Sequence, residues 1–213
     1  MPFFLRFPLS FRIAVDRPNQ NAAPPGPAPL RRLLILTSAL IFWLLMMAVH
    51  ESGHALGAWA TGGRVTRVIL SPLAISRTDV SPNPSPLTVA WCGPLFGAGG
   101  PVLLCLAATS FRWPLRSWLR AFAGFCLIAN GLYLASGVLT PAGDTEELLR
   151  FGAGRAALGL TGVPLACAGF WLWHTLGRQW GLAGAGTDKL RAWALRSCVA
   201  LVVIAAAMLV TSR

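Results

Sequence analysis

Charged residues are scarce in this chain, and lysine and the acidic residues are the rarest of them. Of its 213 residues 12% are charged, seven are Asp or Glu, and Lys189 is the one lysine. Soluble domains carry about 25% charged residues, so the composition excludes an ordinary soluble domain. The 55% share of hydrophobic residues and the mean hydropathy of +0.61 indicate instead a chain that resides in a lipid bilayer.

Paired cysteines and a nucleic-acid-binding pattern are also missing. The five cysteines stand singly, so they predict small hydrophobic side chains rather than disulfides or metal ligands. The net charge of +11 comes from arginines that mark the ends of apolar segments, and no basic run is interleaved with aromatics. We therefore expect the bilayer, and no nucleic acid, as a partner. No cleavable signal peptide is expected, because the first thirty residues lack a continuous apolar core.

The apolar segments predict an all-α polytopic membrane protein with about five transmembrane helices. Each segment is close to the length that a helix needs to cross the hydrocarbon region. The expected spans are residues 33–60, 93–110, 121–139, 157–176 and 192–210. The Ala-, Gly-, Pro- and Arg-rich composition is compatible with a GC-rich bacterial genome, so we expect a multi-pass protein of a bacterial inner membrane.

Three parts are expected along the chain. Residues 1–30 form an N-terminal extended and proline-rich segment, residues 31–150 a three-helix core, and residues 151–213 two additional transmembrane helices. Within the core, residues 64–91 are too polar and too rich in proline to span the membrane. Their short β-prone runs predict a β-hairpin or re-entrant sheet inserted between the first and second helices.

The first span carries the motif His50-Glu51-Ser52-Gly53-His54 near its far end. Residues four apart lie on one face of a helix, so His50 and His54 can direct two imidazole nitrogens at one metal ion. Glu51 lies beside that face, where it can accept a proton from a water activated by the metal. This is the H-E-x-x-H arrangement of zinc hydrolases. A glutamate inside a membrane helix is costly, which favours a functional role over a helix-end cap.

A catalytic zinc site usually has three protein ligands. The third span returns the chain to the side of the two histidines, and Asp144 follows that span directly. Asp144 is therefore the best third ligand, with Glu146 or Glu147 as the fallback. His174 ends the fourth span on the opposite side, among tryptophans typical of an interfacial belt. Asp144 also fits the first position of a helix-capping pattern with Glu147, and the sequence leaves ligand and cap both open.

The chain resembles the site-2-protease family of intramembrane zinc metalloproteases over about residues 33–150. The resemblance lies in HESGHALGAWATGGRV, the sheet-like insert after it, WCGPLFG at the second span, and an aspartate after the third span. Within the family, the chain is similar to small bacterial members whose third motif is Gly-Asp. The resemblance implies that His50, His54 and Asp144 bind one zinc ion per chain and that Glu51 activates water. It also implies that the substrate is a transmembrane segment of another protein.

Two sequence features depart from the family pattern. Family members often have Gly-Pro-x-x-Asn at the second span, whereas Gly97 follows Gly93-Pro94 here. The family's asparagine-rich approach to the aspartate is also missing, and Asn130 lies two to four turns before it. Gly93, Pro94 and Asn130 are the candidate substrate-binding residues.

Two other functions are compatible with the same pattern. One is a non-proteolytic membrane scaffold or metal sensor on the same fold. The other is a small transporter with an ion path through His50, Glu51 and Asp144, although the two halves show no inverted repeat.

The orientation in the membrane is open on sequence grounds. Lysine and arginine are more numerous on the side of the N-terminus than on the side of the two histidines, which favours a cytoplasmic N-terminus. The family resemblance implies the reverse, with zinc near the cytoplasmic face.

Overall fold

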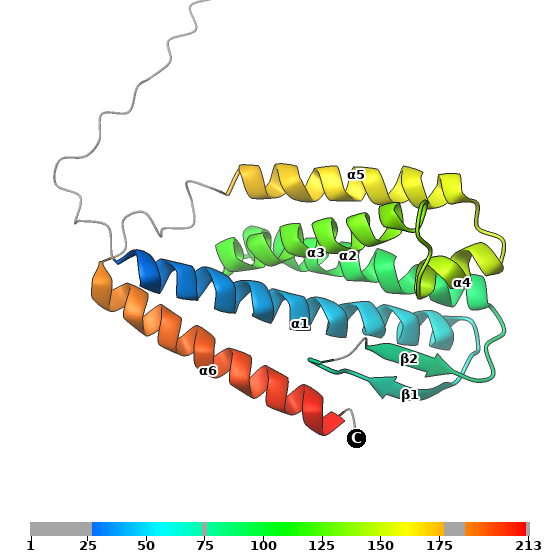
Figure 1. Cartoon of the computed structure of the whole chain (residues 1–213), viewed down its shortest axis with the longest axis horizontal. Coiled ribbons are helices and arrows are strands. Elements are labelled where there is room, and N and C mark those ends of the chain that lie inside the picture. The colour runs from blue at the N-terminus through cyan, green and yellow to red at the C-terminus, as the bar shows by residue number, and fades with distance from the viewer. Residues whose placement is uncertain (1–26, 74–75, 177–185, 212–213) are drawn as a thin grey trace, which may run out of the picture.

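The structure, a computed structural model, describes residues 27–73, 76–176 and 186–211. These residues form six helices and two strands (Figure 1): α1 (Ala28–Ala60), β1 (Val65–Ile69), β2 (Arg77–Val80), α2 (Pro86–Ser110), α3 (Arg116–Ser136), α4 (Asp144–Arg150), α5 (Arg155–His174) and α6 (Thr187–Thr211). Five of these six helices, all except α4, are long and apolar enough to cross a membrane, which confirms the expected count. Most of the N-terminal segment, residues 1–26, lies outside the described residues.

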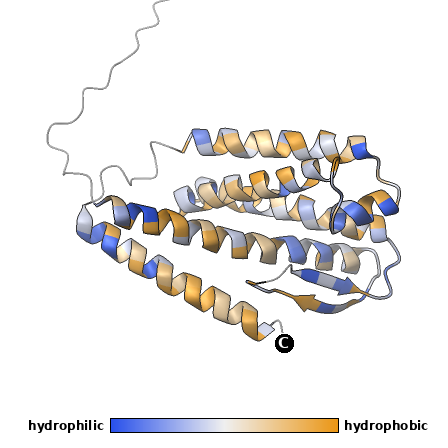
Figure 2. Ribbon diagram, viewed as in Figure 1, coloured by the Kyte–Doolittle hydropathy of each residue, from blue (hydrophilic) through white to orange (hydrophobic). Residues whose placement is uncertain are grey.

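The long helices pack side by side, with α1 and α3 on either side of α2 (Figure 1). The other side of α3 packs against α5, and α6 packs along α1. Apolar residues predominate along α5 and α6 (Figure 2), and leucines, valines and tryptophans of these two helices are exposed. Such outward apolar surfaces are expected of helices that face lipid rather than water.

Small residues bring α3 and α5 close together. A Cβ atom on Gly131 of α3 would overlap the backbone of Gly162 and Ala166 on α5, and one on Gly162 would overlap α3 in return. Such close approach is a common way to pack membrane helices, because van der Waals contact drives their association. Toward the other end of the bundle, the Phe42 ring of α1 meets Trp118 of α3 edge-on, with centroids 4.9 Å apart. These contacts fix the position of α3 relative to α1 and α5.

A small antiparallel sheet follows α1, as the sequence predicts, but it is shorter than the expected insert. Val65 pairs with Val80 and Ile69 with Arg77, whereas residues 74 and 75 are outside the described residues. Helix α2 already begins at Pro86, so the run 88–91, expected within the insert, is helical. Pro86 suits the first turn of a helix, where its missing N–H needs no partner. A short apolar run cannot be assigned to strand or helix by its periodicity alone.

The hairpin and α4 both lie at the end of the bundle where α1 finishes (Figure 1). The opposite end holds His174, as expected, since Arg120 at the start of α3 donates a hydrogen bond to Thr175 at the end of α5. The chain therefore places its third histidine far from His50 and His54, and it places Asp144 near them.

Candidate metal centre

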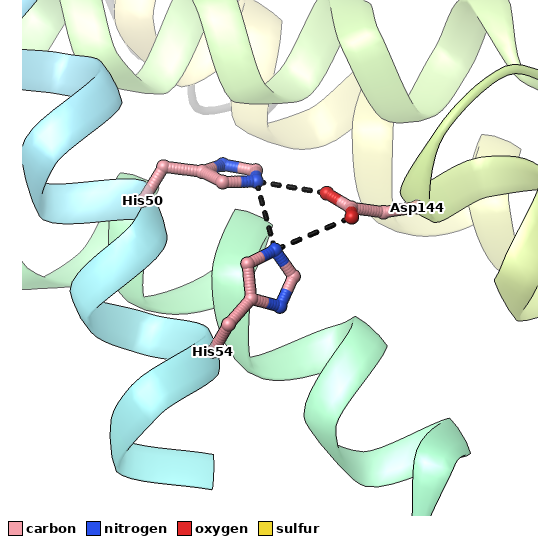
Figure 3. A group of neighbouring side chains, drawn as sticks. All are labelled: His50, His54 and Asp144. Carbon is pink, nitrogen blue, oxygen red and sulfur yellow. Dashed lines mark hydrogen bonds and ion pairs between the residues drawn. The ribbon is translucent and has the colours of Figure 1, made fainter. Parts of the chain in front are cut away.

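His50 and His54 of α1 and Asp144 of α4 point toward one another (Figure 3). The Nε2 atom of His50 lies 2.8 Å from Oδ2 of Asp144, and Nε2 of His54 lies 3.3 Å from Oδ1. The two Nε2 atoms are 3.2 Å apart. Among the described residues this is the group of histidine, cysteine and acidic side chains that could hold a metal ion.

The other ring nitrogen of each histidine is held by a carbonyl oxygen. Nδ1 of His50 donates to Oδ1 of Asn130 at 2.8 Å, and the Asn130 amide nitrogen donates to the Cys126 carbonyl, which fixes the orientation of that amide. Nδ1 of His54 donates to the carbonyl of Val89 at 2.8 Å. Because a carbonyl oxygen only accepts, Nδ1 carries the proton in both rings, and a neutral imidazole then presents a lone pair at Nε2.

These donors fit a zinc ion. A tetrahedral zinc with ligands at about 2.0–2.2 Å holds its donor atoms about 3.3–3.6 Å apart. Two of the observed separations, 3.2 and 3.3 Å, lie near this range. The third, 2.8 Å between Nε2 of His50 and Oδ2 of Asp144, is a hydrogen-bond distance that would lengthen around an ion. Two imidazole nitrogens and one carboxylate also match the donor set of catalytic zinc sites, which use three protein ligands and leave one position for water or substrate.

Asp144 is fixed by its own surroundings. Its backbone N–H donates to the Tyr133 hydroxyl at 2.7 Å, and that hydroxyl donates to the carbonyl of Ala142 at 3.0 Å. Gly143 before it has a φ of 55°, a conformation that favours glycine, and a Cβ there would crowd the Tyr133 oxygen. Burial raises the pKa of the Asp144 carboxyl, but when the His50 and His54 rings carry a proton on Nε2 as well as on Nδ1, their hydrogen bonds to Asp144 outweigh burial and hold the pKa well below its usual range.

The alternative role of Asp144 as a helix cap is not what the structure shows. The cap position of α4 is Gly143, and Asp144 is the first helical residue. Its carboxylate oxygens face the two histidines instead of the free N–H groups of its own helix. Glu146 and Glu147, the fallback ligands, are exposed one turn further on.

Glu51 is buried, with 5% of its surface exposed, although it carries a carboxylate. Its Oε2 accepts a hydrogen bond from the Thr78 hydroxyl of β2 at 2.8 Å. An unpartnered buried carboxylate would be costly, so this bond from the hairpin stabilises Glu51 at its place beside the metal group.

A cleft of about 1220 Å³ opens onto this group. Its walls come from α1, the hairpin, α3 and α4, and they include His50, Glu51, His54 and Asp144. Next to these polar groups the wall becomes apolar along α1, where Trp43, Met46 and Met47 line it. The cleft therefore joins the candidate metal group to a surface that suits apolar side chains.

The substrate-binding candidates occupy three different surroundings. Asn130 lines the cleft, and its side chain is bonded to His50 and to its own helix. Gly93 lies against the His54 ring, where a Cβ would overlap it. Pro94 is buried among the packed helices. Contact of these three with a substrate stays a prediction, while Gly93 and Asn130 clearly shape the positions of the two histidines.

Thr78, Tyr133 and the carbonyl of Val89 are site residues that the sequence did not single out. Tyr133 is the only tyrosine of the chain and lies 11 residues before Asp144, which is the one sequence feature that points to it. Nothing in the sequence pairs Thr78 with Glu51 or Val89 with His54. Such contacts depend on how separate segments pack.

Gly93→Ala is expected to lower the affinity for metal by about ten- to a hundredfold, as the loss of a group that orients a metal ligand does. The reason is steric, since the added methyl group would displace the His54 ring between two packed helices. Gly99→Ala is the matched control on the same helix, because a Cβ there meets nothing within 4 Å. Metal titration of both purified variants measures the difference. Equal affinities would show that the ring does not need this space.

Comparisons of the chain with models of protein families, with curated proteins and with solved structures found no match. The described residues provide five helices that are long and apolar enough to cross a membrane, and a His-His-Asp group able to hold a metal ion.

Proposed function

We propose that this chain is a zinc-dependent intramembrane endopeptidase that cuts a transmembrane segment of another membrane protein. One observation carries the proposal: Glu51, buried and held by Thr78, adjoins a His50-His54-Asp144 group at the wall of a cleft. Neutral ligands with fixed ring orientations, one carboxylate ligand and a neighbouring carboxylate base are the parts that hydrolytic zinc sites combine. We also propose that the membrane in which the chain resides is the inner membrane of a bacterium.

The mechanism assigns one task to each group. His50, His54 and Asp144 would hold the zinc, and the ion would supply Lewis-acid activation of water and of the scissile carbonyl. Glu51 accepts the proton that the attacking water loses and donates it to the leaving amine. Asn130 and the Val89 carbonyl keep the Nδ1 protons of the two histidines in place, so that each Nε2 stays free for the ion.

The substrate must present an extended segment, since the amides of a transmembrane helix are hydrogen-bonded within it. In the described part of the chain the sheet has two strands, and residues 76–80 line the cleft. An extended segment could add to β2 as a further strand, with its carbonyl groups near the metal group. The apolar wall around Trp43, Met46 and Met47 would accommodate its side chains.

Removal of the metal is expected to abolish cleavage. The assay places the full chain in phospholipid vesicles with a single-span test protein, tagged at both ends, whose helix is interrupted by a glycine–serine pair. Treatment with ortho-phenanthroline should reduce cleavage by about a hundredfold or more. Without the ion neither the attacking water nor the scissile carbonyl is activated, and proton transfer by Glu51 alone supplies only part of the rate. One equivalent of zinc should restore it.

The isomer meta-phenanthroline is the control, because it has similar shape and polarity but cannot chelate. Equal inhibition by both isomers would point to an effect on the membrane. Undiminished cleavage by a chain that elemental analysis shows to be free of metal would overturn the proposal.

A further inference from the structure

Thr78 joins the hairpin to the carboxylate of Glu51. It lies in β2 opposite Val68 of β1, and its hydroxyl is directed across to α1, where it meets Oε2 of Glu51 at 2.8 Å. The backbone carbonyl of Glu51 is also within 3.2 Å of that hydroxyl. Both residues line the cleft, so the contact lies at the surface that a substrate would meet.

We infer that Thr78 is the positioning residue of the general base, and that through it the strand that receives the substrate also aligns the base. This inference rests on the proposed function. A carboxylate has two oxygens, and a donor that engages Oε2 fixes the rotation of the group, which leaves Oε1 to face the attacking water. The donor comes from β2 and not from the helix that carries Glu51, so a shift of the strand changes the direction of the base.

The geometry separates this role from a purely structural one. Threonine and valine have nearly the same shape, and valine also favours strands, so the hydroxyl is not needed for the strand itself. Thr66 in the neighbouring strand offers a comparison, because its hydroxyl donates to the backbone carbonyl of Asp79 within the hairpin. Of the two threonines, Thr78 is the one whose hydroxyl leaves the sheet to reach α1.

The test compares Thr78→Val with Thr78→Ser, Thr78→Ala and Thr66→Val in the full chain, with the tagged test protein as substrate. Thr78→Val and Thr78→Ala are expected to lower kcat by roughly ten- to a hundredfold, the range for a lost hydrogen bond to a charged group. KM and the metal content should stay within twofold of wild type. Thr78→Ser keeps a hydroxyl and should recover most of the rate, and Thr66→Val should cut as wild type does.

A second readout does not need cleavage. Acetohydroxamic acid binds a catalytic metal and donates its hydroxyl proton to the neighbouring base, and visible absorption of the cobalt-loaded chain reports its affinity. Thr78→Val should weaken this affinity by roughly tenfold or more, as Glu51→Gln should, while Thr66→Val should leave it unchanged.

The outcomes separate this inference from the proposed function. If Thr78→Val cuts as fast as wild type, the role of Thr78 is overturned. The role is also overturned if the variant cuts more slowly because its KM has risen or because it has lost metal. If the wild type binds metal but cuts nothing, the proposed function fails, and the hydroxamate affinities then decide on Thr78 alone. A wild type that takes up no metal overturns both.

Discussion

Asp144→Ala is expected to lower the affinity of the chain for zinc by about a hundredfold or more. This loss is larger than the loss expected when a group that only orients a ligand is removed, because in our proposal Asp144 is itself a ligand. The Asp144 carboxylate provides the oxygen donors that face both Nε2 atoms, at 2.8 Å from His50 and 3.3 Å from His54. Without it two neutral imidazoles remain, and the positive ion loses the one negative charge among its ligands. Elemental analysis of protein purified in parallel with wild type measures the loss.

Asp144→Asn is the sharper form of the same experiment. Asparagine keeps the size of the side chain and its ability to cap a helix, but it has no negative charge. We expect it to lose zinc nearly as completely as alanine does. Glu146→Ala and Glu147→Ala are the matched controls, since both side chains are exposed on the same short helix. Full zinc content in Asp144→Asn together with loss in either control would transfer the ligand role to that glutamate.

Glu51→Gln should keep one zinc per chain and lower kcat for the tagged test protein by about a hundred- to ten-thousandfold, the range for general acid–base catalysis. Glutamine fills nearly the same volume and can still accept the hydrogen bond from Thr78 through its amide oxygen. What it cannot do is accept a proton from water. The substitution therefore removes the proposed chemistry and leaves the metal group and the hairpin in place.

The same variant distinguishes a protease from a scaffold or a metal sensor. A scaffold or a sensor needs the metal group but not the base, so Glu51→Gln would leave its function intact. Glu147→Gln makes the same chemical change on the wall of the cleft, away from the histidines, and should cut as wild type does. Equal cleavage by wild type, Glu51→Gln and Glu147→Gln would remove Glu51 from the mechanism.

Local patterns in the sequence predicted much of the fold and half of the site. Apolar length and hydropathy located the long helices, and the four-residue spacing placed His50 and His54 on one face. Counting spans brought Asp144 to their end of the bundle and left His174 at the other. These inferences succeed because each depends on helix periodicity or on the thickness of a bilayer, which are properties of a segment by itself. The start of α2 was missed, because a short apolar run fits a strand as well as a helix.

The tertiary structure alone decided which groups surround the metal ligands and the base. The contacts of His50 with Asn130, of His54 with Val89 and Gly93, and of Glu51 with Thr78 join segments that lie 27 to 80 residues apart. They depend on the rotation and depth of each helix against its neighbours, which packing determines and hydropathy does not. The sequence by itself thus determined that two histidines and a glutamate share one end of a membrane helix. Packing decided that Asp144 completes their group and that a strand of the hairpin holds the glutamate.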